Sequence, residues 1–175
     1  MQKKNDMDLQ AYNKLSYGVY IIASGDKDKK NAFVCTAAIQ VTADPPKIAV
    51  VCNKNNHTTG IIKEKKNFSV SVLSQNYQPL TLGTFGFRTG KDFDKFGKAT
   101  FIYGTETGVP IVLDDIIAWF ECELEQSVDV GTHIIFVGKV LQSQTIAENE
   151  TPLTYKYYHE IKKGIVHKNA PSNNQ

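Results

Sequence analysis

Two consecutive prolines, Pro45 and Pro46, constrain the fold of this chain more than any other feature. They separate the apolar run AFVCTAAIQVT from a second run, KIAVVC, which leads into the polar stretch NKNNHTTG. Proline has no backbone N–H and cannot donate to a sheet, so both runs must end at the prolines. We therefore predict two strands joined by a sharp corner, followed by the start of a helix.

The polar stretch has the features of an anion-binding helix start. Asn55 or Asn56 is a suitable N-cap, and free backbone N–H groups of the first turn can hold a phosphate. Lys54, Thr58 and Thr59 could complete such a site. An ordinary capped helix is the alternative and is favoured when the stretch is considered alone, although the stretch has more donors than capping needs.

Length and charge predict a soluble, cytoplasmic protein with one domain at residues 1–168 and a disordered tail at 169–175. The formal net charge of +2 gives no indication of a nucleic-acid or membrane partner. Three widely spaced cysteines form no disulfide framework or zinc-ligand pattern. The polar N-terminus lacks an apolar signal region, and no later run approaches the length of a spanning helix.

Strand-like runs dominate the pattern, and they predict a mainly β fold, a closed or nearly closed antiparallel Greek-key barrel with a few short helices. The predicted strands are residues 17–24, 32–42, 47–52, 67–73, 100–103, 117–125 and 133–144, and the predicted helices are 8–15, 57–66 and 79–85. In AWFECELE, apolar and polar residues alternate as in a half-solvated strand, with Trp119 an exception on its polar face. A cofactor would lie at a barrel mouth or between subunits.

Three further segments have side chains suited to a flat ligand. For each of them, ordinary packing is the alternative explanation. NAFVCTA is a strand whose small central residues allow a ring to approach, and LGTFGFRTGKDFDKF joins hinge glycines to aromatics and Arg88. In DVGTHIIFVG, His133 follows a Gly-Thr turn into an apolar strand, and a histidine side chain there could donate a hydrogen bond to a flavin. The glycines do not fit the dinucleotide spacing, and no Ser/His/Asp grouping, HExxH or P-loop is present.

Taken in this order, the segments resemble the flavin reductase-like family, which has the FMN-binding split barrel, over about residues 13–163. CTAAIQVTADPP followed by IAVVCNKNNHTTGII matches the family's small-residue strand, proline corner, second strand and helix start. FGFRTGKDFDKF, VDVGTHIIFVGKV and PLTYKYYHEIKKG are most similar to flavoredoxins and to the flavin reductase domain of high-molecular-weight rubredoxins.

The resemblance implies FMN at the interface of a homodimer, with NADH or NADPH as co-substrate. The candidate cofactor-binding residues are Val34, Cys35, Thr36 and Ala37 on the strand, Asn53, Lys54, Asn55, Asn56, His57, Thr58 and Thr59 at the phosphate, and Phe87, Arg88, Thr89 and Tyr158. His133 and Cys35 are the candidate catalytic residues, and no metal is implied. No rubredoxin module follows Gly164, so an electron partner of that kind would be a separate protein.

The predicted function is an NAD(P)H:flavin oxidoreductase in which hydride passes to flavin N5 and electrons go on to a rubredoxin, a flavodiiron protein, a ferric complex or free flavin. Two alternatives remain open at this point. One is a flavoredoxin-type electron carrier that does not react with NAD(P)H. The other is a small barrel that binds single-stranded nucleic acid through aromatic side chains, which the near-neutral charge disfavours.

Overall fold

The computed structural model describes residues 7–161. The end of the predicted domain at residue 168 and the predicted disordered tail at 169–175 lie outside this range. In chain order the elements are η1 (Leu9–Lys14), β1 (Tyr20–Gly25), β2 (Lys30–Cys35), β3 (Ala38–Ala43), β4 (Pro46–Asn53), α1 (His57–Lys65), β5 (Asn67–Leu73), α2 (Pro79–Phe87), β6 (Phe101–Tyr103), β7 (Pro110–Val112), β8 (Ile116–Asp129), β9 (His133–Thr145) and α3 (Tyr155–Glu160).

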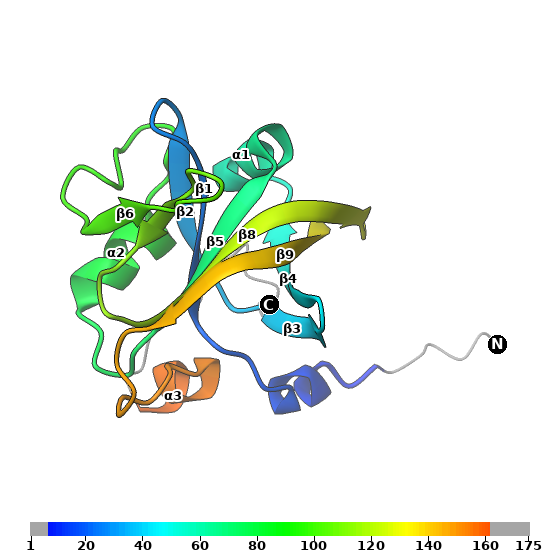
Figure 1. Ribbon diagram of the computed structural model, residues 1–175. Coiled ribbons are helices and arrows are strands. Elements are labelled where there is room, and N and C mark those ends of the chain that lie inside the picture. The colour runs from blue at the N-terminus through cyan, green and yellow to red at the C-terminus, as the bar shows by residue number, and fades with distance from the viewer. Residues whose placement is uncertain (1–6, 162–175) are drawn as a thin grey trace.

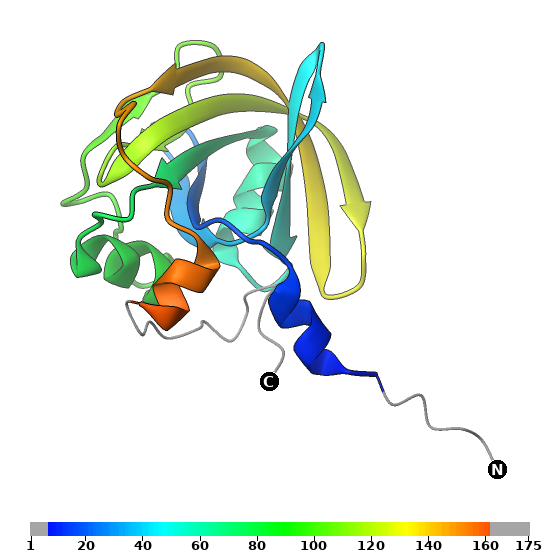
Figure 2. The same ribbon diagram turned by 90° about the horizontal axis from the view of Figure 1, so that it is seen from below.

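Seven strands form one antiparallel sheet in the order β2-β1-β5-β8-β9-β4-β3. The long strands β8 and β9 curve strongly, and the sheet curls around α1 into a nearly closed barrel (Figures 1 and 2). The hydrogen-bonded order leaves β2 and β3 at the two edges, and the thiol of Cys35 on β2 donates to the Val51 carbonyl of β4 at 3.4 Å. The prediction of a mainly β split-barrel fold is confirmed.

The proline corner is confirmed, whereas the single strand predicted at 32–42 is wrong. β3 ends at Ala43 and β4 begins at Pro46, with a cis peptide between Asp44 and Pro45. The chain between β2 and β3 changes partner at Thr36 and Ala37, because β2 pairs with β1 whereas β3 pairs with β4. Both halves have strand-forming residues, so the sequence pattern does not reveal the change of partner.

The sheet has apolar clusters on both faces. Ile22, Phe68 and Phe136 belong to the cluster packed with Ile62 of α1, whereas Ile21 belongs to a second cluster beneath α2 and the β6–β7 pair. Neighbouring residues of β1 therefore face different clusters, and five of the six are buried.

The prediction of a solvated face on β8 is wrong at Glu121, again because both faces of the sheet are covered in this region. Trp119 is 9% exposed and packs in the second cluster, and Glu121 is fully buried beneath the loop that joins β6 to β7. Only the later part of β8, from residue 123, carries exposed side chains. In the first half of β8 the alternation therefore marks two different buried environments, whereas Glu123 and Glu125 are exposed as predicted.

Polar side chains fasten the β6–β7 pair to the main sheet. Ser69 and Ser71 of β5 donate to the carbonyls of Pro110 and Val112 at 2.7 and 2.8 Å. Glu121 Oε1 accepts the Thr107 backbone N–H at 2.6 Å. Since these groups are buried, their hydrogen bonds offset the cost of removing them from water.

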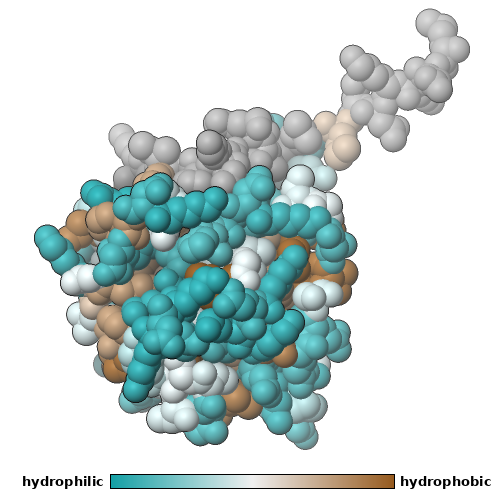
Figure 3. All heavy atoms as spheres, turned by 90° about the horizontal axis from the view of Figure 1, so that it is seen from above, coloured by the Kyte–Doolittle hydropathy of each residue, from teal (hydrophilic) through white to brown (hydrophobic). Residues whose placement is uncertain are grey.

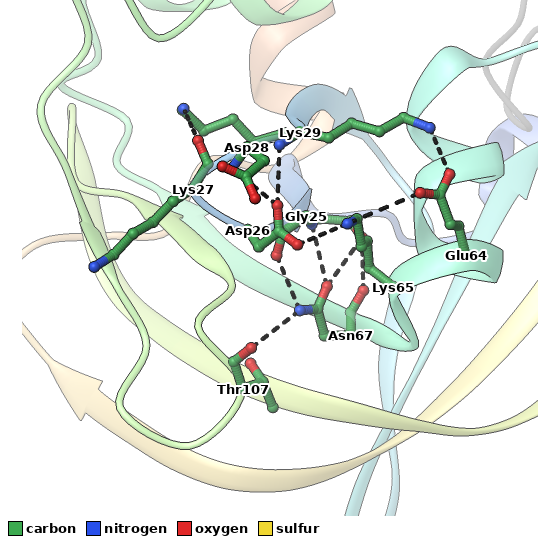
Figure 4. A network of polar contacts seen from close by, with 11 residues as sticks. Gly25, Asp26, Lys27, Asp28, Lys29, Glu64, Lys65, Asn67 and Thr107 are labelled. Atoms are coloured by element: carbon green, nitrogen blue, oxygen red, sulfur yellow. Dashed lines mark hydrogen bonds and ion pairs between the residues drawn. The ribbon is translucent and has the colours of Figure 1, made fainter.

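A second polar network joins the β1–β2 turn to the end of α1 and the start of β5 (Figure 4). The Asp26 carboxylate accepts from the backbone N–H of Lys29 at 2.9 Å and from Lys65 Nζ at 2.7 Å. These hydrogen bonds, chiefly the one from Lys65, lower the pKa of Asp26 to about 2. Asn67 adds a buried amide that donates to the Gly25 carbonyl at 3.0 Å.

The face seen from above is mostly hydrophilic, with small separate hydrophobic patches (Figure 3).

Candidate functional site

A pocket of about 320 Å³ lies between β2, the end of β4, the start of α1, and α2 with the loop that follows it. Its size is within the usual range for ligand sites, about 300 to 1,000 Å³. The lining residues are Asn31, Phe33, Val34, Cys35, Val51, Asn53, Asn55, Asn56, His57, Phe85, Gly86, Phe87, Arg88, Thr89, Gly90 and Lys95. Apolar side chains come mainly from β2 and α2, and amide donors come from the segment before α1.

The structure brings three of the predicted segments together at this pocket. Val34 and Cys35 of the strand, Asn53, Asn55, Asn56 and His57 of the helix start, and Phe87, Arg88 and Thr89 after α2 all line it. Thr36, Ala37, Lys54, Thr58, Thr59, Tyr158 and His133 are not among the lining residues. Segments that lie far apart in the sequence therefore meet at one pocket.

The segment before α1 is held by asparagine side chains. Asn53 Oδ1 accepts the Asn55 N–H at 2.9 Å, and the Asn53 carbonyl accepts the Asn56 N–H at 3.0 Å. Asn56 is the N-cap, because its Oδ1 accepts the Thr58 N–H at 3.1 Å. Helix α1 ends after Lys65, with Lys66 in the left-handed conformation. This is an ordinary capped helix that also forms one end of the pocket.

The threonine hydroxyls and Lys54 have partners within the protein. Thr58 is fully buried, and its Oγ1 accepts from Asn31 Nδ2 at 3.1 Å. Thr59 Oγ1 donates to the Asn53 carbonyl at 2.7 Å. Lys54 Nζ lies 2.6 Å from Asp129 Oδ2, and this contact is the main cause of the lowered pKa of Asp129. These side chains stabilise the shape of the helix start.

Cys35 is a buried thiol in the pocket wall. Its Sγ lies 3.4 Å from the Val51 carbonyl and 3.6 Å from the Ala37 carbonyl, which share its one S–H donor, and burial raises its pKa to about 11. A thiol with that pKa is protonated at neutral pH, so this environment does not produce a thiolate nucleophile. Thr36 and Ala37 follow it at the change of partner between β2 and β3, where the Ala37 carbonyl accepts the Val51 N–H at 3.0 Å.

His133 begins β9 directly opposite Asn53 of β4, which places it beside the polar end of the pocket. Its Nδ1 lies 2.8 Å from Thr132 Oγ1. Its Nε2 is buried and has no hydrogen-bond partner among residues 7–161. A buried imidazole nitrogen without a partner is suited to a ligand or to a group from another chain.

Tyr158 lies on α3, away from the segments that line the pocket. Its ring centroid is 6.4 Å from that of Tyr77, and it packs against the second apolar cluster. The structure therefore does not bring Tyr158 to the pocket with the other predicted residues.

Lys95 and Asn31 line the pocket and were not predicted. Lys95 is 5% exposed, and its Nζ donates to the Ala32 carbonyl at 2.8 Å and the Phe85 carbonyl at 3.1 Å. Burial lowers its pKa to about 8. In the sequence Lys95 is one of several charged residues in KDFDKF, so no pattern marks it as the buried one.

The opposite rim of the pocket is an exposed loop with a cation–π pair. The Arg88 guanidinium carbon lies 4.3 Å from the centroid of the Phe93 ring. Phe87 and Phe93 are 47% and 38% exposed. The pocket thus combines an apolar wall, a polar end and an aromatic rim, an arrangement suited to a planar ligand with a polar or charged tail.

Comparison with known proteins identifies the family to which the chain belongs. The model of the flavin reductase like domain matches residues 12–162, so the chain belongs to the flavin reductase-like domain family. It is 40% identical over 166 residues to a high molecular weight rubredoxin of Moorella thermoacetica, covering 95% of this chain and 72% of the relative. It is 39% identical over 158 residues to a ferric-chelate reductase (NAD(P)H) of Archaeoglobus fulgidus, covering 90% of this chain and 92% of the relative.

Among solved structures, the NADH:FAD oxidoreductase SgcE6 of Streptomyces globisporus C-1027 superposes with a TM-score of 0.74 at 19% identity, covering 82% of this chain and 83% of the other. That likeness shows the fold alone. The family confirms the prediction of an oxidoreductase of the flavin reductase class. Within residues 7–161, none of the helices combines the length and apolar character needed to cross a membrane.

Proposed function

We propose that the protein binds FMN in the pocket between β2 and α2 and acts as an NAD(P)H:flavin oxidoreductase. The observation that carries the proposal is the meeting of the small-residue strand, the capped start of α1 and the aromatic loop after α2 at one pocket. The ferric-chelate reductase relative is named for NAD(P)H, which supports a pyridine nucleotide as the electron donor.

The residues present fit such a cofactor. FMN is the flavin that we propose, whereas the SgcE6 neighbour is named for FAD. Val34 and Phe85 offer apolar contact to a ring, Asn55 and Asn56 offer polar contact to a ribityl chain, and Lys95 is a buried cation. When bound, FMN would supply the redox chemistry, accepting a hydride and passing electrons onward.

The protein's own residues would bind the flavin, orient it and cover it. The carbonyl partners of the Cys35 thiol fix the wall on which a ring would lie. Phe87 and Arg88 form a rim against which a nicotinamide can stack. His133, with its buried Nε2 beside Asn53, is the side chain we assign to hydrogen bonding near the reacting groups.

A homodimer is part of the proposal. Edge strand β3 exposes Ile39 and Val41, and the β8–β9 end exposes Val128 and Val130. Apolar side chains on an unpaired sheet edge favour association with another copy. Analytical ultracentrifugation tests this: a single monomer boundary across micromolar concentrations contradicts the dimer.

The first experiment is a visible spectrum of the purified protein, followed by titration of the flavin-free protein with FMN and FAD. We expect flavin bands and tighter binding of FMN. A preparation that remains colourless with both flavins contradicts the proposal. The physiological acceptor, whether a rubredoxin, a flavodiiron protein, a ferric complex or free flavin, is then sought by anaerobic mixing of the reduced protein with each candidate.

The second experiment separates a reductase from a flavoredoxin-type carrier. Anaerobic mixing of the FMN-loaded protein with NADH and with NADPH should bleach the flavin absorbance within the enzyme's turnover time. Unbleached flavin with both nucleotides favours the carrier. His133→Ala should slow bleaching more than it lowers FMN occupancy, and unchanged rates remove His133 from the reaction.

A further inference from the structure

A layer of buried polar side chains lies between the main sheet and the β6–β7 pair. In the register of β5 and β8, Ser71 pairs with Trp119 and Ser69 pairs with Glu121. Residues two apart on a strand face the same side, so these four side chains share one face of the sheet. Trp119 is 9% exposed and the other three are fully buried. Each polar atom of the layer therefore needs a hydrogen-bond partner other than bulk water.

Most of these atoms have partners on the β6–β7 pair and the loop that joins its strands. The hydroxyls of Ser69 and Ser71 donate to backbone carbonyls of β7. Glu121 Oε1 accepts from the backbone N–H groups of Glu106 and Thr107 at 3.1 and 2.6 Å, and from Thr107 Oγ1 at 2.8 Å. One oxygen of the Glu121 carboxylate is thus fully used in holding this loop.

Two atoms of the layer, Trp119 Nε1 and Glu121 Oε2, are buried and have no hydrogen-bond partner among residues 7–161. They are of opposite kinds, because an indole N–H can only donate and a carboxylate oxygen can only accept. In the described part of the chain, no cation lies within ion-pair distance of Glu121 either. Burial without a partner destabilises the folded state at both atoms. A single group that accepts from one atom and donates to the other would remove both costs.

The chemistry of the two atoms selects this group. A direct hydrogen bond is disfavoured, because residues two apart on a strand are separated by about 6.7 Å and their side chains stand side by side. A metal cation would suit Glu121 Oε2, but the indole N–H of Trp119 would direct its positive end toward the ion. A water molecule accepts from the indole and donates to the carboxylate, and its second hydrogen can go to a serine oxygen of β5.

We propose that one buried water molecule bridges Trp119 Nε1 and Glu121 Oε2 between the main sheet and the β6–β7 pair. Glu121 then has two tasks, since Oε1 holds the loop between β6 and β7 and Oε2 holds the water. Neither Trp119 nor Glu121 lines the flavin pocket, so this water site is independent of the proposed function. A protein that fails to bind flavin would still contain it.

A crystal structure of the wild type that resolves ordered water tests the geometry. We expect a water molecule at about 2.7 to 3.2 Å from both Trp119 Nε1 and Glu121 Oε2. The proposal is overturned if no water lies between the two atoms or if they bond each other directly. A cation on Glu121 Oε2, recognised by several oxygen ligands and no contact with the indole, also overturns it.

A measurement in solution counts the water. Oxygen-17 relaxation dispersion of the solvent reports how many water molecules stay bound for longer than the protein takes to tumble. Trp119→Phe removes the indole donor and should lower this number by one. Ser143→Ala is the matched control and should leave it unchanged, because Ser143 is exposed and pairs with Phe120, the neighbour of Trp119 that faces the other side. The same number in wild type and Trp119→Phe contradicts the bridge.

The wild type alone decides the matter if Trp119→Phe fails to fold. Trp119 is the only tryptophan of the chain, so its indole N–H gives one unambiguous NMR signal. This proton should show a nuclear Overhauser effect to water with the sign of a bound molecule. An indole signal without any such effect overturns the proposal.

Discussion

The buried ammonium of Lys95 predicts a specific dependence of stability on pH. Its pKa is lowered from 10.5 to about 8 by burial, so the unfolded chain holds this proton more tightly than the folded protein does. Such a group destabilises the folded state when charged, and stability rises as pH increases from the folded to the unfolded pKa. The full difference corresponds to about 3 kcal/mol, an order-of-magnitude figure for a side chain that is almost wholly buried.

Only part of that difference is accessible to a simple experiment. Between pH 7 and pH 9 the linkage relation gives a gain of about 1.3 kcal/mol for the wild type from this group alone. Lys95→Met removes the titration. The free energy of unfolding of the wild type should therefore rise by about 1.3 kcal/mol relative to the variant over this interval.

Urea unfolding of both flavin-free proteins at pH 7, 8 and 9 measures this directly. The buried thiols of Cys35, Cys52 and Cys122 have raised pKa values and lower the stability of both proteins at the alkaline end, so they cancel in the difference. Lys98→Met provides the control and should run parallel to the wild type. If the Lys95→Met and wild-type curves are parallel as well, Lys95 is not an electrostatically strained cation and the reasoning is refuted.

Three other predictions follow from the packing. Asn56→Ala removes the cap of α1 and should lower the free energy of unfolding by about 1 kcal/mol in urea titrations; no change would show that the cap is dispensable. Gly104→Ala should severely destabilise the folded protein, because its Cβ would lie 2.3 Å from the Glu121 carboxylate. At Gly60 an added Cβ meets no atom within 4 Å, so Gly60→Ala should stabilise α1 by about 0.5 to 1 kcal/mol. Similar melting temperatures for the two variants would refute this. In NMR titrations the Asp26 carboxyl should titrate with a pKa of about 2, and Lys65→Ala should raise that pKa. The stabilisation from this carboxylate is therefore present above its unfolded pKa of about 4 and is lost as the pH falls toward 2. An unaltered pKa in the variant would assign the lowering to the backbone donors.

The sequence predicted the elements that local chemistry defines. Pro45 and Pro46 placed the corner, and Asn56 and the residues after it placed α1 to within a residue of its observed end. The change of partner at Thr36 was missed because it depends on which strand lies alongside, which local propensity does not encode. The second face of β8 was missed for a similar reason, since Glu121 is polar yet is covered by a loop.

The candidate site was predicted by segment rather than by atom. The sequence indicated which stretches hold donors, but not that Thr59 and Lys54 would find partners inside the protein. Lys95 shows the converse limit. Its buried position depends on hydrogen bonds to the carbonyls of Ala32 and Phe85, which belong to β2 and α2 and not to its own loop.

The way Ser69 and Ser71 fasten the β6–β7 pair has a consequence for how that pair can move. A backbone ladder tolerates slippage, but these two hydroxyls reach the carbonyls of Pro110 and Val112 at a matching two-residue spacing. A slip of one residue would break both hydrogen bonds at once and leave buried carbonyls without donors. The β6–β7 pair therefore has a single register on the sheet, and it can detach only as a unit.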